Sequence, residues 1–248
     1  MFKKTKRLLL VSGLSYGLAV RSLHPSPSDL LNPAWHREAP LRLMMLAFTR
    51  LLPALYERYG ERGVRALQYV FYRAGEDRAP ILLEELQIDP YDARSLGRVL
   101  DFEDGLVGVR GIWTEESRGR AVKEERYCPA AGELEACPEV CTCLMMAFEA
   151  GTFSVINPDL NVPEITELLS RGDSCCRATI ELPLAKREAK KVSPQATPGE
   201  FPPVLHVPGL REKLALSGLK SVVSALRTLV TKGLDQPMMW YEHFRYQP

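Results

Sequence analysis

Residues 106–127 read LVGVRGIWTEESRGRAVKEERY, and this stretch decides the fold class. Its first part, 106–113, has an alternating pattern and is rich in residues that favour β-strands. A polar turn follows over 114–119, and a second strand is expected over 120–127. The stretch therefore predicts a β-hairpin.

Two further strands are expected after the hairpin. The segments 163–169 and 177–184 are typical of a strand pair that turns at Arg171-Gly172-Asp173. Between the two pairs, 138–150 has helical character, and Pro138 stands in the first turn, where a missing N–H does no harm. The predicted fold is α+β, an antiparallel β-sheet of about four strands with an inserted helix, packed against N-terminal helices.

The spacing of apolar residues before the hairpin is helical. From 39 to 74 they recur every three or four residues, which predicts two helices joined around Tyr59-Gly60-Glu61, with Gly60 capping the first. A further short helix is expected near 78–87, and another should begin near Asp92. After a proline-rich break over 24–29, the Asn32-Pro33-Ala34 sequence indicates a second turn or a helix start.

Composition divides the chain into four parts. The first, 1–31, is a basic and apolar extension in which a run of basic residues precedes an uncharged run over 8–20. That run resembles the start of a secretory signal but lacks a small-x-small cleavage site, and an interfacial helix is the alternative. The α+β cysteine-bearing domain follows over 32–184, then a Pro/Lys-rich linker over 185–208 and a C-terminal helix with an aromatic tail over 209–248.

The C-terminal helix, expected over about 209–232, has an apolar face beside basic residues. The face consists of Leu219, Val222, Val223, Leu226 and Val230, and the basic residues are Lys213, Lys220, Arg227 and Lys232. Two interpretations stay open: packing on its own domain or on a homodimer partner, and contact with a membrane surface. We expect a cytoplasmic protein, with peripheral membrane attachment through 209–248 as the alternative.

Bulk properties exclude several classes of function. With 248 residues, 46% hydrophobic and 25% charged, the composition is that of a globular protein. A net charge of only +1 gives no general attraction for nucleic acid, so no nucleic-acid partner is expected. The chain has no phosphate loop, no dinucleotide-binding glycine motif, no His-Glu-x-x-His and no Gly-x-Ser-x-Gly, which disfavours nucleotide-dependent enzymes, zincins and α/β-hydrolases.

All six cysteines fall between 128 and 176. Cys141 and Cys143 flank one residue and Cys175 adjoins Cys176, so neither pair suits a structural disulfide, and a reducing compartment is expected. Three interpretations stay open. Cysteines such as Cys137, Cys143 and Cys175 pack a core; a metal or iron–sulfur site forms on Cys128, Cys137, Cys141 and Cys143, although their spacing matches no ordinary zinc knuckle; or Cys141, near a helix start, is a thiolate nucleophile or sensor.

Carboxylates near the cysteines offer a general base for activating water. Glu133, Glu135 and Glu139 surround the predicted helix start, and Asp173 precedes Cys176. Surface charge is the alternative for each of them, and for Asp173 a further alternative is a turn residue that bonds neighbouring backbone N–H groups.

One set of motifs resembles a known family. Tyr127-Cys128-Pro129, Cys141 about a dozen residues on and Gly172-Asp173-x-x-Cys176, with the lead-in Tyr56-Glu57-Arg58-Tyr59-Gly60, resemble the L-2-amino-thiazoline-4-carboxylic acid hydrolase family over roughly 40–183. The resemblance implies an α+β domain and hydrolytic opening of a cyclic amidine. The Gly-Asp-x-x-Cys turn is also similar to the 4-vinyl reductase domain family of small-molecule-binding modules, but Cys128-Pro129 favours the hydrolases.

The expected function is hydrolysis of a small C–N-bonded molecule, such as a sulfur-containing cyclic amidine, without a cofactor. The candidate catalytic residues are Cys128, Cys141, Cys176 and Asp173, and thiolate attack and base catalysis both stay open. One alternative is a non-enzymatic module that senses a small molecule, a metal or a thiol. Another is a catalytically inactive interaction subunit.

Overall fold

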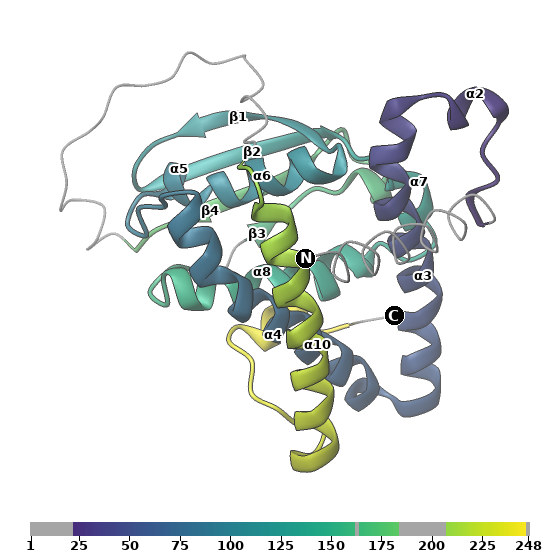
Figure 1. Ribbon diagram of the computed structural model, residues 1–248. Helices are drawn as coiled ribbons and strands as arrows, with labels where there is room; N and C mark the ends of the chain where they lie inside the picture. The colour runs from purple at the N-terminus through teal and green to yellow at the C-terminus, as the bar shows by residue number, and fades with distance from the viewer. Residues whose placement is uncertain (1–21, 162–163, 184–206, 247–248) are drawn as a thin grey trace.

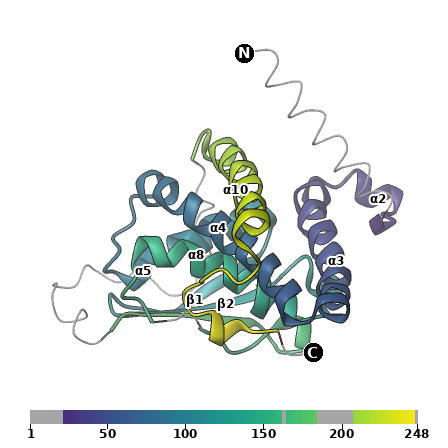
Figure 2. The ribbon, with the colours of Figure 1, turned by 90° about the horizontal axis from the view of Figure 1, so that it is seen from below.

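A computed structural model of the chain describes residues 22–161, 164–183 and 207–246. Four antiparallel strands form one sheet, and helices cover one of its faces (Figures 1 and 2), so the predicted α+β fold is confirmed. The basic and apolar run of the N-terminal extension and residues 185–206 of the predicted linker lie outside the described residues.

The sheet has the strand order β1-β2-β4-β3. Its strands are β1 (Arg110–Glu116), β2 (Arg120–Tyr127), β3 (Glu164–Ile165) and β4 (Cys176–Glu181). The predicted hairpin is β1 and β2, and the central pairing of β2 with β4 sets Glu125 opposite Cys176 and Lys123 opposite Ala178. Residues paired across antiparallel strands point to the same face of the sheet, so this register fixes which side chains meet beneath the helices.

Three strand boundaries differ from those expected. Residues 106–107 end helix α6 (Arg98–Val107) instead of starting a strand, because Gly108 at φ 85° ends the helix and turns the chain into β1. Strand β3 has two residues, and a 3-10 turn, η2 (Leu169–Arg171), takes the place of its predicted end. Strand β4 ends at Glu181, two residues before Pro183, which has no N–H to donate to a ladder.

The N-terminal helices begin and end where local signals place them. After a short helix α2 (Pro27–Leu30), α3 (Pro33–Tyr59) begins with the Asn32 side chain accepting a hydrogen bond from the Ala34 backbone N–H at 3.0 Å. Gly60, at φ 61°, separates α3 from α4 (Glu61–Glu85), as predicted. The separate short helix expected near 78–87 was wrong, because α4 continues through Pro80.

Shorter helices connect these long ones to the sheet. The predicted start near Asp92 is confirmed, since its side chain accepts hydrogen bonds from the Arg94 and Ser95 backbone N–H groups and caps α5 (Ala93–Leu96). After β2, α7 (Ala131–Leu134) leads into a π-helical turn, η1 (Val140–Met145), and α8 (Met146–Ile156). The inserted helix is therefore longer than the predicted 138–150, and it begins in a π-helical form that is rare and often found at functional sites.

Helices α4 and α8 lie against one another without space for side chains at their crossing. A Cβ placed on Gly151 would lie 2.0 Å from the Tyr72 backbone oxygen, and one on Gly75 would lie 2.1 Å from that of Phe148. Figure 2 shows both helices between the sheet and α10 (Leu210–Lys232), which packs on the outer side of α4. A final 3-10 turn, η3 (Tyr241–Phe244), returns the chain to α4 and α8.

Two large apolar clusters fill the interior. The first joins the inner face of the sheet to α4, α5, α6 and α8 through residues such as Leu96, Trp113, Ala121, Phe153 and Ile180. The second lies between α3, α4 and the π-helical turn, and it includes Leu52, Val64, Cys137, Cys143 and Leu144. The candidate site lies where the thiols beside the second cluster meet the end of the sheet.

Candidate functional site

The six cysteines are all free thiols, and the fold divides them into two kinds. Cys137 and Cys143 belong to the second apolar cluster, where the Gln68 side-chain amide donates a hydrogen bond to the Cys143 Sγ at 3.1 Å. Cys175 points elsewhere and donates to the Glu167 carboxylate at 3.2 Å. These three residues have the packing or local hydrogen-bonding roles that small buried cysteines commonly have.

The other three cysteines, Cys128, Cys141 and Cys176, are brought together from separate elements. Cys176 begins β4 opposite Glu125, Cys128 follows the end of β2, and Cys141 lies in the π-helical turn. They are close enough that charge on Cys128 or on Cys176 would raise the pKa of Cys141. Their grouping was predicted from motifs alone. The register of β2 with β4 places Cys176 near the end of β2, where Cys128 follows, and the π-helical turn adds Cys141.

These thiols are protonated near neutral pH. Burial is the largest cause in each case, and it raises the pKa of Cys128 to about 11 and that of Cys176 to about 12. The pKa of Cys141 is raised further, first by burial and then by the neighbouring thiols. The expected lowering at a helix start does not occur, because desolvation of a buried thiolate outweighs a helix dipole.

A carboxyl group that the sequence did not single out, Glu125, lies beside the three thiols. It faces inward with Ala121 and Lys123, since alternate residues of β2 share one face and both of those are buried. Burial, and then the charge of Asp104, raises the pKa of Glu125 to about 8, although Lys123 opposes the shift. In turn, charge on Glu125 would raise the pKa of all three thiols.

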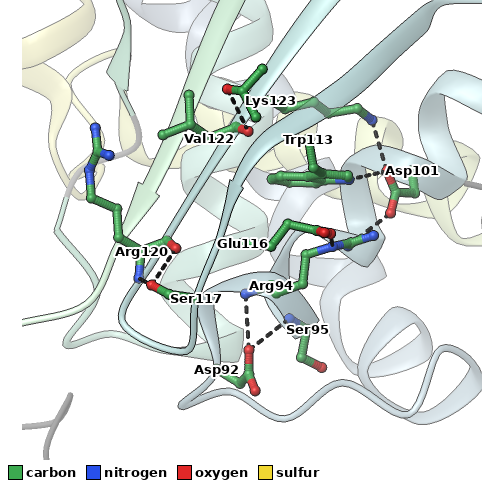
Figure 3. A network of polar contacts seen from close by, with 11 residues as sticks. Asp92, Arg94, Ser95, Asp101, Trp113, Glu116, Ser117, Arg120, Val122 and Lys123 are labelled. Carbon is green, nitrogen blue, oxygen red and sulfur yellow. Dashed lines mark hydrogen bonds and ion pairs between the residues drawn. The ribbon is translucent and has the colours of Figure 1, made fainter. Parts of the chain in front are cut away.

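Behind Glu125, a buried lysine holds two carboxylates of α6. The Lys123 Nζ lies 3.0 Å from the Asp101 Oδ1 and 2.6 Å from the Asp104 Oδ2. The Asp101 Oδ1 also accepts a hydrogen bond from the Trp113 Nε1–H at 2.9 Å, and its Oδ2 lies 3.0 Å from the Arg94 Nη1. Figure 3 shows both contacts. Burial alone would lower the pKa of Lys123, but the two carboxylates together raise it, so this lysine is a fixed positive charge.

The row of inner carboxylates continues to Glu103. Arg78 donates from Nη1 to Glu103 and from Nη2 to Glu149 at 3.0 Å, and its Nε donates to Thr152 at 2.7 Å. Burial raises the pKa of Glu103 to about 8 and that of Asp104 to about 6, against the pull of Arg78 and Lys123 respectively. Glu103, Asp104 and Glu125 influence one another and can hold a proton between them near neutral pH.

Asp173 does not join the thiols. Its Oδ2 accepts a hydrogen bond from the Leu168 backbone N–H at 2.8 Å, and the residue is exposed. It therefore forms the turn, which was the alternative interpretation, while Gly172 provides the positive φ of 87° beside it.

The three glutamates near the start of the inserted helix have other partners or are exposed. Of these, Glu133 would raise the pKa of Cys128, but less than Glu125 and Asp104 do. Glu133 pairs with Arg42 at 2.6 Å, Glu139 lies 3.8 Å from Arg171, and Glu135 is exposed. The inner carboxylates Glu125, Asp104 and Glu103 take the place that these residues were expected to have. The sequence contains only a weak signal for Glu125: it shares the two-residue period of Ala121 on the predicted strand, as Lys123 also does.

The four-cysteine metal set is divided by the fold. Cys137 and Cys143 lie inside the second apolar cluster, whereas Cys128 and Cys141 pack against its outside, where Cys176 and Glu125 act on their pKa values. Across residues 22–161, 164–183 and 207–246, no group of three or more His, Cys, Asp or Glu side chains is arranged to hold a metal ion.

No protein-family model matches the chain, and no curated protein and no solved structure matches it. The resemblance to the thiazoline-carboxylate hydrolases stays a prediction.

Proposed function

We propose that this protein is a hydrolase of a small C–N-bonded molecule, of the cyclic amidine class, and that Glu125 is its general acid–base. The observation that carries the proposal is the convergence of Glu125 with Cys128, Cys141 and Cys176 from three elements far apart in the sequence. The motif resemblance points to the same chemistry.

Base catalysis suits this group of residues better than covalent catalysis. A nucleophilic cysteine needs a thiolate, and the pKa values of about 11 and 12 for Cys128 and Cys176 keep these thiols neutral. A general base works best with a pKa near the working pH, and Glu125 has one of about 8.

The reaction is a simple addition of water. The ionised Glu125 takes one proton from water while the oxygen bonds to the amidine carbon and the electron pair of the C=N bond moves to nitrogen. A ring bond from that carbon then breaks as that pair re-forms a double bond to carbon, and the released nitrogen or sulfur atom takes the proton from Glu125. The hydroxyl proton then moves to nitrogen to give the C=O product. The three neutral thiols line the site and give it a soft, weakly polar wall.

The test is a ring-opening assay with 2-amino-thiazoline-4-carboxylate and a panel of small cyclic amidines, with products followed by mass spectrometry. Glu125→Gln should lower kcat by about 100-fold or more, the usual contribution of a general base. Serine variants at Cys128, Cys141 and Cys176 should keep most of kcat. Glu164→Gln is the control, since that carboxylate is exposed on β3.

Two outcomes would reject the mechanism. Full activity in Glu125→Gln would show that Glu125 is not the general base. Loss of activity in a single folded thiol variant would favour a covalent mechanism through that thiol. In the active protein, kcat/KM should rise as the pH rises through about 8, because Glu125 must be ionised to accept a proton.

The grouping of three free thiols favours one second candidate, a module that binds a small molecule or a soft metal without turnover. As placed, the thiols form no metal-binding group among the described residues, so metal binding would require them to move closer together. Elemental analysis of protein purified without oxygen distinguishes the two. Stoichiometric zinc or iron that is lost on Cys128→Ser or Cys141→Ser, in a protein inactive towards the whole panel, would favour the second candidate.

A further inference from the structure

Helix α10 has an apolar stripe that faces away from the rest of the molecule. The stripe, here called the α10 ridge, follows the three-and-four spacing of one helix face and consists of Leu216, Leu219, Val223, Leu226 and Val230. Between 46% and 86% of each residue's surface is exposed. Figures 1 and 2 show α10 at the outside of the molecule, with α4 behind it.

The opposite face of α10 already has a partner. Ser221, Ala225 and Leu229 are buried, and the latter two form an apolar cluster with Tyr69 of α4. Ser217 adds a hydrogen bond to the Asp77 backbone oxygen of α4 at 3.3 Å. The helix is therefore held in a fixed orientation, and the ridge is the side that remains for another surface.

Positive charge lies along one edge of the ridge. Lys220 and Arg227 are exposed and seven residues apart, so they lie on the same side of the helix, about one step round from Leu216 and Val223. The helix as a whole has five basic residues and one acidic residue, whereas the complete chain has a net charge of only +1. The cations are thus concentrated beside exposed apolar side chains.

By length and composition, α10 is also apolar enough to cross a membrane. Two features favour a position along the surface instead. Lys220 and Arg227 lie well inside the helix, where a spanning orientation would put their charges in hydrocarbon at considerable cost. Such an orientation would also separate Ala225 and Leu229 from α4.

Charge also distinguishes a lipid surface from a second copy of the chain. In a twofold symmetric dimer the same patch faces itself, so the ridge would bring its basic edge towards a second basic edge. The only acidic residue on α10 is Glu212, near the N-terminal end and away from Arg227. An anionic bilayer satisfies both the exposed leucines and valines and the cations.

We propose that α10 is a membrane-docking helix that binds the surface of an anionic lipid bilayer. The α10 ridge enters the region between the headgroups and the acyl chains, and Lys220 and Arg227 contact lipid phosphates. Docking through α10 leaves the sheet, on the far side of α4 and α8, directed away from the bilayer. The inference is independent of the proposed hydrolase activity.

The test uses the full chain in a flotation assay with two kinds of vesicle, phosphatidylcholine alone and phosphatidylcholine with phosphatidylserine. The wild type should bind the anionic vesicles more tightly. Leu219→Ser/Val223→Ser should weaken that binding at least tenfold. Lys220→Ala/Arg227→Ala should weaken it by about 30-fold, at about 1 kcal/mol for each cation near the surface, and should remove the difference between the vesicles.

The matched control is Arg50→Ala/Leu51→Ser, which removes one exposed cation and one exposed leucine from α3 and should bind as the wild type does. Far-UV circular dichroism shows whether each variant is folded. The proposal is overturned if the wild type binds neither vesicle, or if both α10 variants float like the wild type. It is also overturned if the wild type is a dimer that Leu219→Ser/Val223→Ser converts to a monomer, which would assign the ridge to a second copy.

Discussion

Glu125 links the chemistry of the site to the stability of the protein. Its pKa is about 8 in the folded state and 4.5 as an ordinary side chain. Between these values the folded protein holds a proton that the unfolded chain has lost. Because the unfolded state then binds fewer protons, stability falls as the pH rises. The contribution of Glu125 to the free energy of unfolding is fully present below pH 4.5 and is lost as the pH rises through its folded-state pKa of about 8.

The expected result is a difference in slope between two proteins. In wild type, the free energy of unfolding should fall from about pH 5 to about pH 8, with Glu125 contributing at most about 1.4 kcal/mol per pH unit. Glu125→Gln cannot ionise, so its slope should be shallower by up to that amount. Urea denaturation at a series of pH values measures both.

The control for this measurement is Glu164→Gln, which removes an exposed carboxylate of β3 and should keep the wild-type slope. Parallel curves for wild type and Glu125→Gln would show that Glu125 ionises normally in the folded protein. Glu125 would then not be a base with a pKa near neutral pH.

Among the elements, the crossing of α4 and α8 depends on two glycines. Gly151→Ala would place a Cβ 2.0 Å from the Tyr72 backbone oxygen, and backbone cannot move aside as a flexible side chain can. We expect a loss of about 3 kcal/mol in the free energy of unfolding, measured by urea denaturation, because overpacking forces the two helices apart.

Gly218→Ala is the matched control for this crossing. Gly218 lies within α10, and a Cβ there meets nothing within 4 Å. The same substitution should therefore be neutral or stabilise by up to about 1 kcal/mol, the difference in helix propensity between the two residues. Equal effects at the two positions would mean that the crossing is not close-packed.

The elements also show what local sequence signals can predict. The hairpin, the Gly60 break and the Asp92 cap depend on residues close together in the chain, and all three were predicted. The continuous α4 was missed, because Pro80 locally favours a break. Its neighbours Ala79 and Leu82 are completely buried, and that tertiary packing keeps the helix intact.

For the site too, local features were predictable from the sequence and tertiary contacts were not. Its three thiols stand in recognisable motifs, but Glu125 and Lys123 look like surface charges in a sequence, since charged side chains are rarely buried without partners. Their partners Asp101 and Asp104 lie on α6, and the strand register decides that they meet. The π-helical turn that carries Cys141 has no local sequence signal comparable to these.

At the scale of the molecule, the end of the chain joins the clusters that enclose the site. Tyr246 belongs to the same apolar cluster as Cys137 and Cys143, and Phe244 belongs to that of Tyr72 and Ala147. The buried Gln68 side chain donates a hydrogen bond to the Phe244 backbone oxygen at 2.8 Å and also contacts Cys143. The tail therefore stabilises the interior instead of covering it loosely.

Phe244→Ala tests whether the described chain unfolds as one unit. Phe244 is only 3% exposed, and removing a buried phenyl ring should cost about 3 kcal/mol. Because the tail, α4, α8 and the thiol region share clusters, the whole transition should shift together. Helical circular dichroism and tryptophan fluorescence should then report one coincident urea midpoint, lower than that of the wild type.

The control is Glu242→Ala, whose side chain is 73% exposed and which should stay within about 0.5 kcal/mol of wild type. If Phe244→Ala instead left the circular dichroism midpoint unchanged, the tail would be a separate unit, and changes there would not reach Cys141 or Glu125.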